Sequence, residues 1–115
     1  MRRGDLYWVD LEPTVGSEAN KARPAVIVSN DALNRVAERR GRGVVTVVPV
    51  TSRVDRVFPF QVLLTAGEGG LPSDSKAQAE QIRAVAAERL GARIGAVPPA
   101  ALRRIDDALR LHLAL

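Results

Sequence analysis

The apolar positions of this chain fall in short blocks separated by polar turns, a pattern that predicts strands. "GDLYWVDL", residues 4–11, is rich in aromatic and β-branched residues and predicts a first strand. "PAVIVSN", residues 24–30, is apolar enough for a strand buried on both faces. "VVTVVPV", residues 44–50, predicts the clearest strand, and because Pro49 cannot donate to a ladder we expect it at an edge, a bulge or the strand end. "VFPFQVLLT", residues 57–65, predicts a fourth strand.

The remaining internal segments give one helical signal, one ambiguous stretch and one further strand. "ALNRVAERR", residues 32–40, follows Asp31, a residue type that caps helices, and predicts a short helix. "KAQAEQIRAV", residues 76–85, is ambiguous, because Ala and Glu favour a helix whereas its two β-branched residues favour a strand. "RLGARIGAV", residues 89–97, predicts a short final strand.

The end of the chain has the periodicity of an amphipathic helix, which Pro98 and Pro99 can open in its first turn. Apolar residues recur at helical spacing at Leu102, Ile105, Leu109 and Leu113, with Arg103, Arg104, Asp106, Asp107 and Arg110 on the other side. We expect this helix to pack on the sheet. Five or six short strands with one or two helices predict a mainly β, α+β fold, with a small and strongly bent sheet or barrel, in one domain spanning residues 1–115.

Composition narrows the chemistry that the chain can perform. The 115 residues are 46% hydrophobic and include no Cys, which excludes disulfides, thiolate metal sites and thiol nucleophiles. The only His, His112, has no neighbouring His or Cys with which to form a metal site. The N-terminus does not read as a signal peptide, and no apolar run approaches the roughly 20 residues of a membrane span, so we expect a cytoplasmic protein without a membrane partner.

The charge balance favours a polyanionic partner. The formal net charge is +4, the sequence pI is about 10.6, and nearly all basic residues are Arg, whose planar fork suits phosphate recognition. Arg23 precedes one buried strand, and Thr51 and Ser52 follow another. If these strands pair in antiparallel orientation, Arg23 and Thr51 can lie side by side and suit a phosphodiester. The residues alone also allow Arg23 to be a rim charge and the Thr–Ser pair to be a turn.

Four short motifs, which follow one another along the chain, add to this evidence. They are the opening "GDLYWV", the "GSEANKARPAVIVSN" loop and strand, then "PVTS", then "EQIR". Together they resemble the MazF/PemK family of toxin endoribonucleases, and the similarity covers nearly the whole chain. The resemblance implies an SH3-like small barrel of five to seven strands with a C-terminal amphipathic helix, assembled as a homodimer. It also implies a type II toxin–antitoxin system with a MazE-like antitoxin, whose C-terminal segment covers the RNA groove.

The implied activity is sequence-specific cleavage of single-stranded RNA without a metal or another cofactor. The target would be mRNA, with rRNA or tRNA as further classes, and cleavage would inhibit translation and growth. The 2′-OH would attack its own phosphate and leave 2′,3′-cyclic phosphate and 5′-OH ends. The resemblance assigns catalysis to Arg23 and Thr51. Arg23 would stabilise the transition state, and Thr51 would bind a phosphate oxygen or orient the 2′-OH.

Further residues have supporting assignments. Ser52 lies beside Thr51, and Glu80 is either a general base or structural. The expected RNA-binding residues are Glu18, Asn20, Lys21, Arg53, Arg56 and Gln81. Some family members have an Arg where this chain has Gln78, and some have a His in the first loop, so the acid–base assignment stays open. Most of the four aromatic residues, Tyr7, Trp8, Phe58 and Phe60, are expected in the core.

Two other classes of function remain as alternatives. A barrel of similar fold could poison DNA gyrase, as the related CcdB group does, although the apolar C-terminal "LRLHLAL" lacks the aromatic end associated with that group. A non-catalytic nucleic-acid-binding barrel is the third reading.

Overall fold

A computed structural model describes residues 1–11 and 22–115. Helix α1 spans Asp31–Arg40 and helix α2 spans Pro99–Leu113, and short 3-10 turns occupy η1 (Glu68–Gly70), η2 (Ala79–Gln81) and η3 (Ala87–Arg89). The strands are β1 (Asp5–Asp10), β2 (Ala22–Ile27), β3 (Val44–Thr51), β4 (Gln61–Leu64), β5 (Ser75–Gln78), β6 (Arg83–Ala86) and β7 (Leu90–Ala96). No helix within these described residues is long and apolar enough to cross a membrane.

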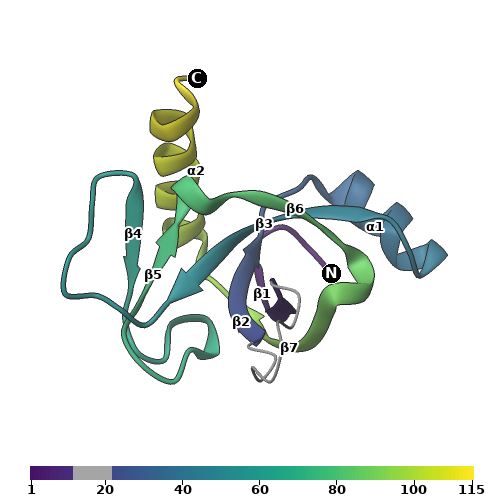
Figure 1. Ribbon diagram of the computed structural model, residues 1–115, viewed down its shortest axis with the longest axis horizontal. Helices are drawn as coiled ribbons and strands as arrows, with labels where there is room; N and C mark the ends of the chain where they lie inside the picture. Colours follow the sequence, from purple (N-terminus) through teal and green to yellow (C-terminus); the bar gives the residue numbers. More distant parts are fainter. Residues whose placement is uncertain (12–21) are drawn as a thin grey trace, which may run out of the picture.

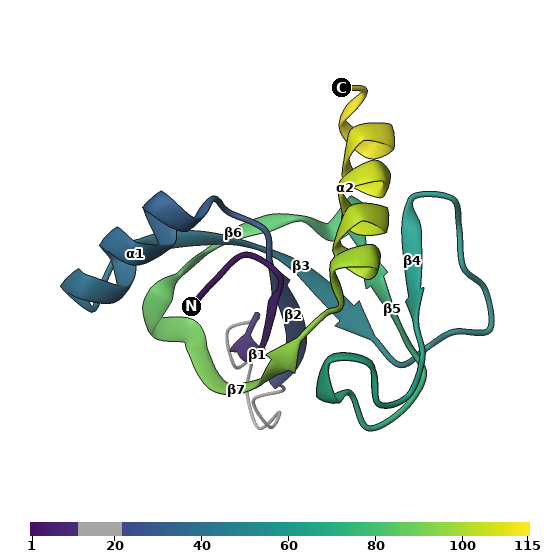
Figure 2. The ribbon, with the colours of Figure 1, turned by 180° about the vertical axis from the view of Figure 1, so that it is seen from behind.

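The described strands form one antiparallel sheet in the order β4-β5-β3-β2-β1-β7, with β6 also paired to β3 (Figure 1). Strand β3 is the hub, because its first half pairs with β6 and its last residues pair with β5. The sheet is strongly bent, as the view from behind shows (Figure 2). Among the described strands, however, no pairing joins β7 to β6 or to β4, so the sheet is not closed. The mainly β, α+β prediction is confirmed, and the expected barrel is an open, curved sheet.

Pro49 is accommodated by a break in the ladder. Val28 donates its backbone N–H to the carbonyl of Thr46 at 2.9 Å, and Ala25 lies opposite Pro49 in the same β2–β3 ladder. Because hydrogen-bonded and non-bonded pairs alternate along antiparallel strands, Ala25–Pro49 is a non-bonded pair and the Pro49 nitrogen faces away from β2. On that side, pairing with β6 stops two residues before Pro49 and pairing with β5 begins one residue after it. The missing N–H therefore leaves no unpaired acceptor within a ladder.

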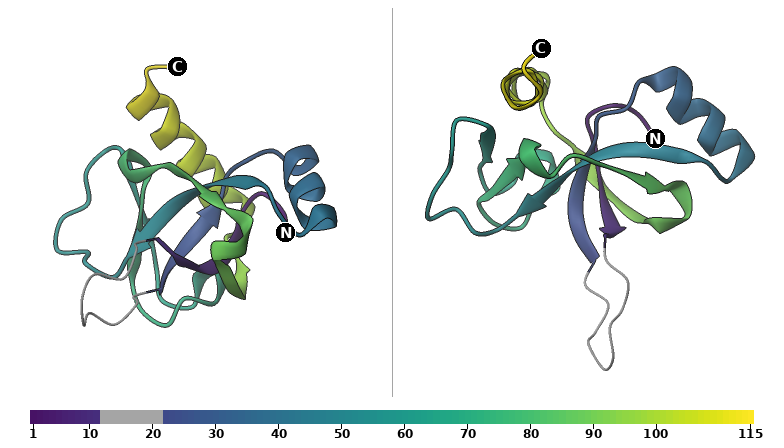
Figure 3. Two further views of the ribbon diagram at one scale, coloured as in Figure 1. Left: turned by 45° about the vertical axis from the view of Figure 1, so that its right-hand side comes forward. Right: turned by 45° about the horizontal axis from the view of Figure 1, so that its top comes forward.

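Strands β2 and β3 separate two apolar cores, which confirms the prediction that β2 is buried on both faces and shows the same for β3. One core lies under α2, and its fully buried members include Val26, Val48 and Ile105. The other lies inside the curve of β1, β3 and β6, and includes Ile27 and Val47. Figure 3 shows α2 over the β4–β5 end of the sheet and α1 at the opposite end.

The structure corrects several predicted boundaries. The fourth strand is only Gln61–Leu64, because Phe58 and Phe60 stack on each other with ring centroids 5.2 Å apart in the loop before it. The ambiguous segment 76–85 is mostly strand, divided between β5 and β6 by the η2 turn. Asn30, rather than Asp31, caps α1 by accepting from the Leu33 N–H at 2.9 Å.

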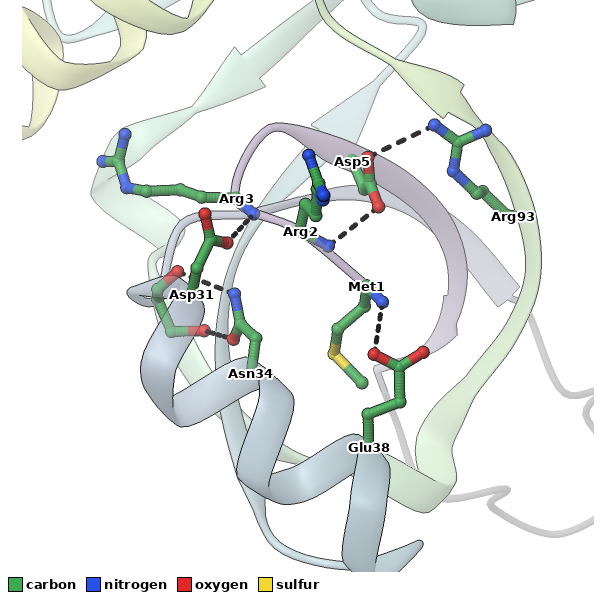
Figure 4. Close-up of polar contacts among 9 residues, drawn as sticks. Met1, Arg2, Arg3, Asp5, Asp31, Asn34, Glu38 and Arg93 are labelled. Carbon is green, nitrogen blue, oxygen red and sulfur yellow. Dashed lines mark hydrogen bonds and ion pairs between the residues drawn. The ribbon is translucent and has the colours of Figure 1, made fainter.

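The N-terminal segment ties α1 to the rest of the fold (Figure 4). The backbone N–H of Arg3 donates to Asp31 Oδ1 at 2.7 Å, and the amino group of Met1 donates to Glu38 Oε2 at 2.8 Å. The Arg3 guanidinium binds the carboxylate of Asp106 on α2 through two nitrogens, and its Nε donates to the carbonyl of Val28. One short segment therefore connects both helices.

Asp31 makes this connection sensitive to pH. Its hydrogen bond from the Arg3 N–H lowers the pKa of the Asp31 carboxyl below its ordinary value. A carboxyl with a lowered native pKa contributes stability above its unfolded-state pKa, and that contribution is lost as the pH falls through its native pKa. We expect wild type to lose more stability than Asp31→Asn between about pH 5 and pH 2, measured by urea unfolding. Asp55→Asn, in the exposed loop after β3, is the control. Parallel profiles of stability against pH for wild type and Asp31→Asn would contradict this account.

Candidate functional site

The β2–β3 register brings Arg23 and Thr51 together. The β2–β3 ladder ends with Ala25 opposite Pro49. If the same register is continued by two residues, Arg23 and Thr51 form a non-hydrogen-bonded pair, whose side chains lie on one face of the sheet. In agreement with this, both residues line one pocket. On the other side of β3, Thr51 lies opposite Lys76 of β5. A hydroxyl thus has a cationic residue on each neighbouring strand.

Arg23 and Thr51 line one pocket of about 670 Å³. Its apolar wall comes from β1, β2, β3 and the loop before β5, and consists of Trp8, Pro24, Val50, Leu71 and Pro72. Its polar wall consists of Arg23, Thr51, Ser52, Arg53, Ser73, Ser75, Lys76 and Gln78. Thr51 Oγ1 accepts the backbone N–H of Arg53 at 3.3 Å, so its own hydroxyl proton can be donated to a bound group. Cations, hydroxyls and an apolar wall together suit a nucleotide.

The expectation that most of the four aromatic residues lie in the core is not met, and Trp8 departs from it furthest. It is 38% exposed, lies opposite Pro24 in the β1–β2 register and lines the pocket. Tyr7, Phe58 and Phe60 are only partly buried. The sequence placed Trp8 in an apolar strand, but the core under that face of β1 ends at Leu6, and Trp8 lies beyond it over the pocket.

The expected RNA-binding residues divide into three groups. Arg53 lines the pocket, whereas Arg56 does not and instead lies over the Phe58 ring, with its guanidinium carbon 4.6 Å from the ring centroid. Gln81 is exposed and lines a neighbouring hollow of about 280 Å³ that shares Arg23 and Gln78 with the pocket. Glu18, Asn20 and Lys21 lie outside the described residues.

Glu80 lies away from the pocket wall and contacts the loop between β3 and β4. Gln61 Nε2 donates to Glu80 Oε2 at 2.7 Å, and Gln61 Oε1 accepts the backbone N–H of Phe58 at 3.1 Å. The other oxygen, Glu80 Oε1, is buried without a hydrogen-bond partner among the described residues. Of its two expected roles, the structural one matches this geometry.

Arg83, in the same "EQIR" motif, secures the end of β1. Its Nη1 donates to the carbonyl of Leu11 at 2.6 Å, and Arg89 Nη1 donates to the carbonyl of Asp10 at 3.2 Å. These two arginines tie the end of the strand that carries Trp8 to β6 and η3. Among the described residues, no three His, Cys, Asp or Glu side chains gather in a way that could hold a metal ion.

Lys76 is a site residue that the sequence reading missed. It is only 8% exposed, yet it lines the pocket, and its ammonium donates to the carbonyl of Arg56 at 2.5 Å. The same ammonium lies 5.9 Å from the centroid of the Phe58 ring. It therefore holds the loop that follows Thr51, which supplies Ser52 and Arg53 to the pocket. No short motif marks Lys76, because its role follows from pairing between β3 and β5.

The sequence matches a family model described as "PemK-like, MazF-like toxin of type II toxin-antitoxin system" over residues 2–113. The chain belongs to this toxin family. It is 61% identical over 115 residues to endoribonuclease MazF9 of Mycobacterium tuberculosis, covering 100% of this chain and 98% of that relative. It is 33% identical over 116 residues to endoribonuclease EndoA of Bacillus subtilis, covering 100% and 96%.

Solved structures of family members share the fold. A mycobacterial endoribonuclease in complex with its cognate antitoxin superposes with a TM-score of 0.79 at 30% identity, covering 100% of this chain and 96% of that chain. MazF in the MazE–MazF complex (Form-II) from Deinococcus radiodurans gives a TM-score of 0.80 at 27% identity, with the same coverage. The open sheet with its C-terminal helix is therefore the MazF architecture.

The loop held by Lys76 generates a prediction for this toxin. Lys76→Met keeps the length of the side chain but removes the donor, and a hydrogen bond from a charged group contributes about 1.5–3 kcal/mol. We expect faster amide hydrogen exchange in residues 53–58, by roughly 10- to 100-fold, and a raised KM for RNA. Lys76→Arg, which keeps a cationic donor, should recover much of the protection. Unchanged exchange in residues 53–58 of Lys76→Met would show that Lys76 does not hold the loop.

Proposed function

We propose that this chain is the endoribonuclease toxin of a type II toxin–antitoxin system, and that it cleaves single-stranded RNA at preferred sequences. Its main substrate would be mRNA, with rRNA or tRNA as further targets, so that translation and growth stop. The observation that carries the proposal is the shared pocket of Arg23 and Thr51. It occurs in a chain that is 61% identical along its whole length to a relative named endoribonuclease MazF9.

The proposed chemistry uses the nucleophile that RNA itself supplies. The ribose 2′-oxygen attacks the adjacent phosphorus, the new O–P bond forms, and the bond from phosphorus to the 5′-oxygen breaks. The 2′-OH proton leaves to a base and the 5′-oxygen gains a proton, which gives 2′,3′-cyclic phosphate and 5′-OH ends. The protein has to align the 2′-OH, stabilise the charge on the phosphorane and assist the proton transfers.

The pocket residues suit these tasks. The Arg23 guanidinium can bind two phosphate oxygens through its fork, and a guanidinium side chain stays positively charged in proteins. The Thr51 hydroxyl, whose oxygen already accepts the Arg53 N–H, can donate to a phosphate oxygen or orient the 2′-OH, with Ser52 beside it. We assign stabilisation of the transition state to Arg23. Of these three residues, Arg23 alone is also assigned to protonate the 5′-oxygen.

The apolar wall provides a place for a base next to the scissile phosphate. Trp8 and Pro24 lie side by side on neighbouring strands and face the same pocket as Arg23. An unstacked base of single-stranded RNA can lie on an aromatic face while its edges meet polar groups. Ser73, Ser75 and Gln78 are the polar groups of the pocket wall that could read those edges.

We also assign to the toxin a homodimeric state, a MazE-like antitoxin and a cytoplasmic location. Exposed Leu63 of β4 and Leu111 of α2 line a hollow of about 730 Å³ on the α2 side, an apolar surface suited to a second copy. The cations of the pocket, Arg23, Arg53 and Lys76, can accept an acidic antitoxin segment that folds on contact. Sedimentation equilibrium that returns only the 12.4 kDa monomer at micromolar concentration would refute the dimer.

The decisive experiment incubates the pure toxin with a long natural single-stranded RNA in EDTA. We expect fragments whose upstream pieces end in 2′,3′-cyclic phosphate and whose downstream pieces begin with 5′-OH, and mapping the cuts would give the recognition sequence. Gyrase inhibition without RNA cleavage would support a gyrase poison instead. RNA retention with neither activity would support a non-catalytic binding protein.

Variants at the pocket test the two catalytic assignments. Arg23→Ala should lower kcat by about 10²- to 10³-fold, equivalent to about 2.7–4 kcal/mol, the scale of a lost oxyanion donor. Arg23→Lys keeps a charge but loses the fork and should fall between this variant and wild type. Thr51→Ala should be slower than wild type, and Thr51→Ser should retain most of the rate because it keeps the hydroxyl.

The control for these variants is Arg103→Ala, which removes an exposed cation from α2, remote from the pocket. All variants should keep the circular dichroism spectrum and the urea midpoint of wild type within a small margin. Full cleavage by a folded Arg23→Ala would remove Arg23 from the mechanism, and equal rates for Thr51→Ala and wild type would remove Thr51.

A further inference from the structure

Helix α1 and the turn that follows it carry a concentration of arginine that the cleavage site does not use. The stretch "RVAERRGR", residues 35–42, contains Arg35, Arg39, Arg40 and Arg42. All four side chains are exposed, and none belongs to an ion pair among the described residues. Arg35 and Arg39 are four residues apart and so lie on the same face of the helix.

The two acidic residues of α1 bind the N-terminal segment but also lie near these arginines. Glu38 lines one surface hollow together with Arg35 and Arg39. The charge of Arg35 helps to lower the pKa of Asp31. Asp31 accepts the Arg3 N–H at 2.7 Å, and Glu38 binds the amino group of Met1 at 2.8 Å (Figure 4). The N-terminal segment adds exposed Arg2 close to Asp31, whose pKa it helps to lower. Because five exposed arginines stand against these two carboxylates, this end of the molecule keeps a net positive charge.

The outer face of α1 is uncovered. Only Asn34 and Ala37 are buried, whereas Leu33 is 56% and Val36 is 36% exposed. Arg35 and Arg39 flank a hollow of about 420 Å³ whose lining comes entirely from α1. A hollow formed by one helix is too shallow to enclose the side chains of a peptide, but phosphate groups need only point contacts with exposed cations.

Strand β3 connects this face to the cleavage pocket. Val44, its first residue, follows the arginine-bearing turn, and Thr51, its last residue, lines the pocket. At about 3.3 Å per residue the two ends are about 23 Å apart. A short RNA centred on the pocket does not extend that far, whereas a longer strand does.

We propose that the outer face of α1 is a second RNA-binding surface, which holds the phosphate backbone of a substrate whose scissile linkage lies in the pocket. The inference rests on the proposed function, since the occupant is the same RNA. The arginine-rich face acts on affinity for long RNA and leaves the chemistry to Arg23 and Thr51. It gives a preference for long substrates that is independent of their sequence and decreases as salt rises.

The test compares the double variant Arg35→Gln, Arg39→Gln with a matched control, Arg103→Gln, Arg110→Gln, which removes the same charge from α2. The affinity of each variant is measured, over a range of salt concentrations, for a long RNA of 2′-O-methyl nucleotides. The blocked 2′-oxygens of this RNA cannot attack. Loss of two single-strand phosphate contacts should reduce the slope of log K against log salt by about 1.4. At 0.1 M salt, a change of about 1.4 in this slope corresponds to a Kd about 25-fold higher for the α1 variant than for wild type. The control should bind as wild type does.

A second arm uses cleavage of RNAs of two lengths. With an RNA of about five nucleotides, the low end of single-strand site sizes, the α1 variant and the control should share one KM. With a long RNA only the α1 variant should show a raised KM, at unchanged kcat. The inference is overturned if the variant binds long RNA normally, if short and long RNA are weakened alike, or if only binding of an acidic antitoxin peptide is lost. Failure of wild type to cleave either RNA would overturn the proposed function instead.

Discussion

The antiparallel register between β2 and β3 is the constraint on which the site depends. It places Ala25 opposite Pro49, and just beyond this pair Arg23 and Thr51 line one pocket. A slip by one residue would turn Arg23 to the other face of the sheet and move Val26 and Val48 out of the core under α2. The same apolar contacts that stabilise the fold therefore also hold Arg23 and Thr51, the residues that we propose for catalysis, in one pocket.

Next to Arg23 and Thr51, two sets of contacts hold the loop that follows β3. Lys76 and the Gln61–Glu80 pair hold the segment after Thr51 from two sides, through the Arg56 carbonyl and the Phe58 N–H. The rings of Phe58 and Phe60 stack on each other in the same loop. Pre-organisation of Ser52 and Arg53 lowers the entropy that must be lost when a phosphate binds. The buried Lys76 thus positions the loop that carries Ser52 and Arg53.

The distribution of charge separates two regions of the molecule. The pocket brings a few cations together with hydroxyls and an apolar wall, which suits recognition of one nucleotide and its phosphate. The α1 end displays exposed arginines that outnumber its two carboxylates, Asp31 and Glu38. Both carboxylates bind the N-terminal segment, so they share their charge between that segment and the arginines.

Pattern alone determined most strands and the C-terminal helix, because alternation and helical spacing are local properties of the chain. It allowed Arg23 and Thr51 to lie side by side only if their strands paired in antiparallel orientation, and it left a rim charge and a turn as the alternative. It could not determine where 76–85 changes from β5 to β6, nor that Trp8 lines a pocket, that Lys76 is buried, or that Glu80 contacts Gln61. Those facts depend on which strands become neighbours across the bent sheet. Local propensity carries no record of such long-range pairing, so only the tertiary structure decided them.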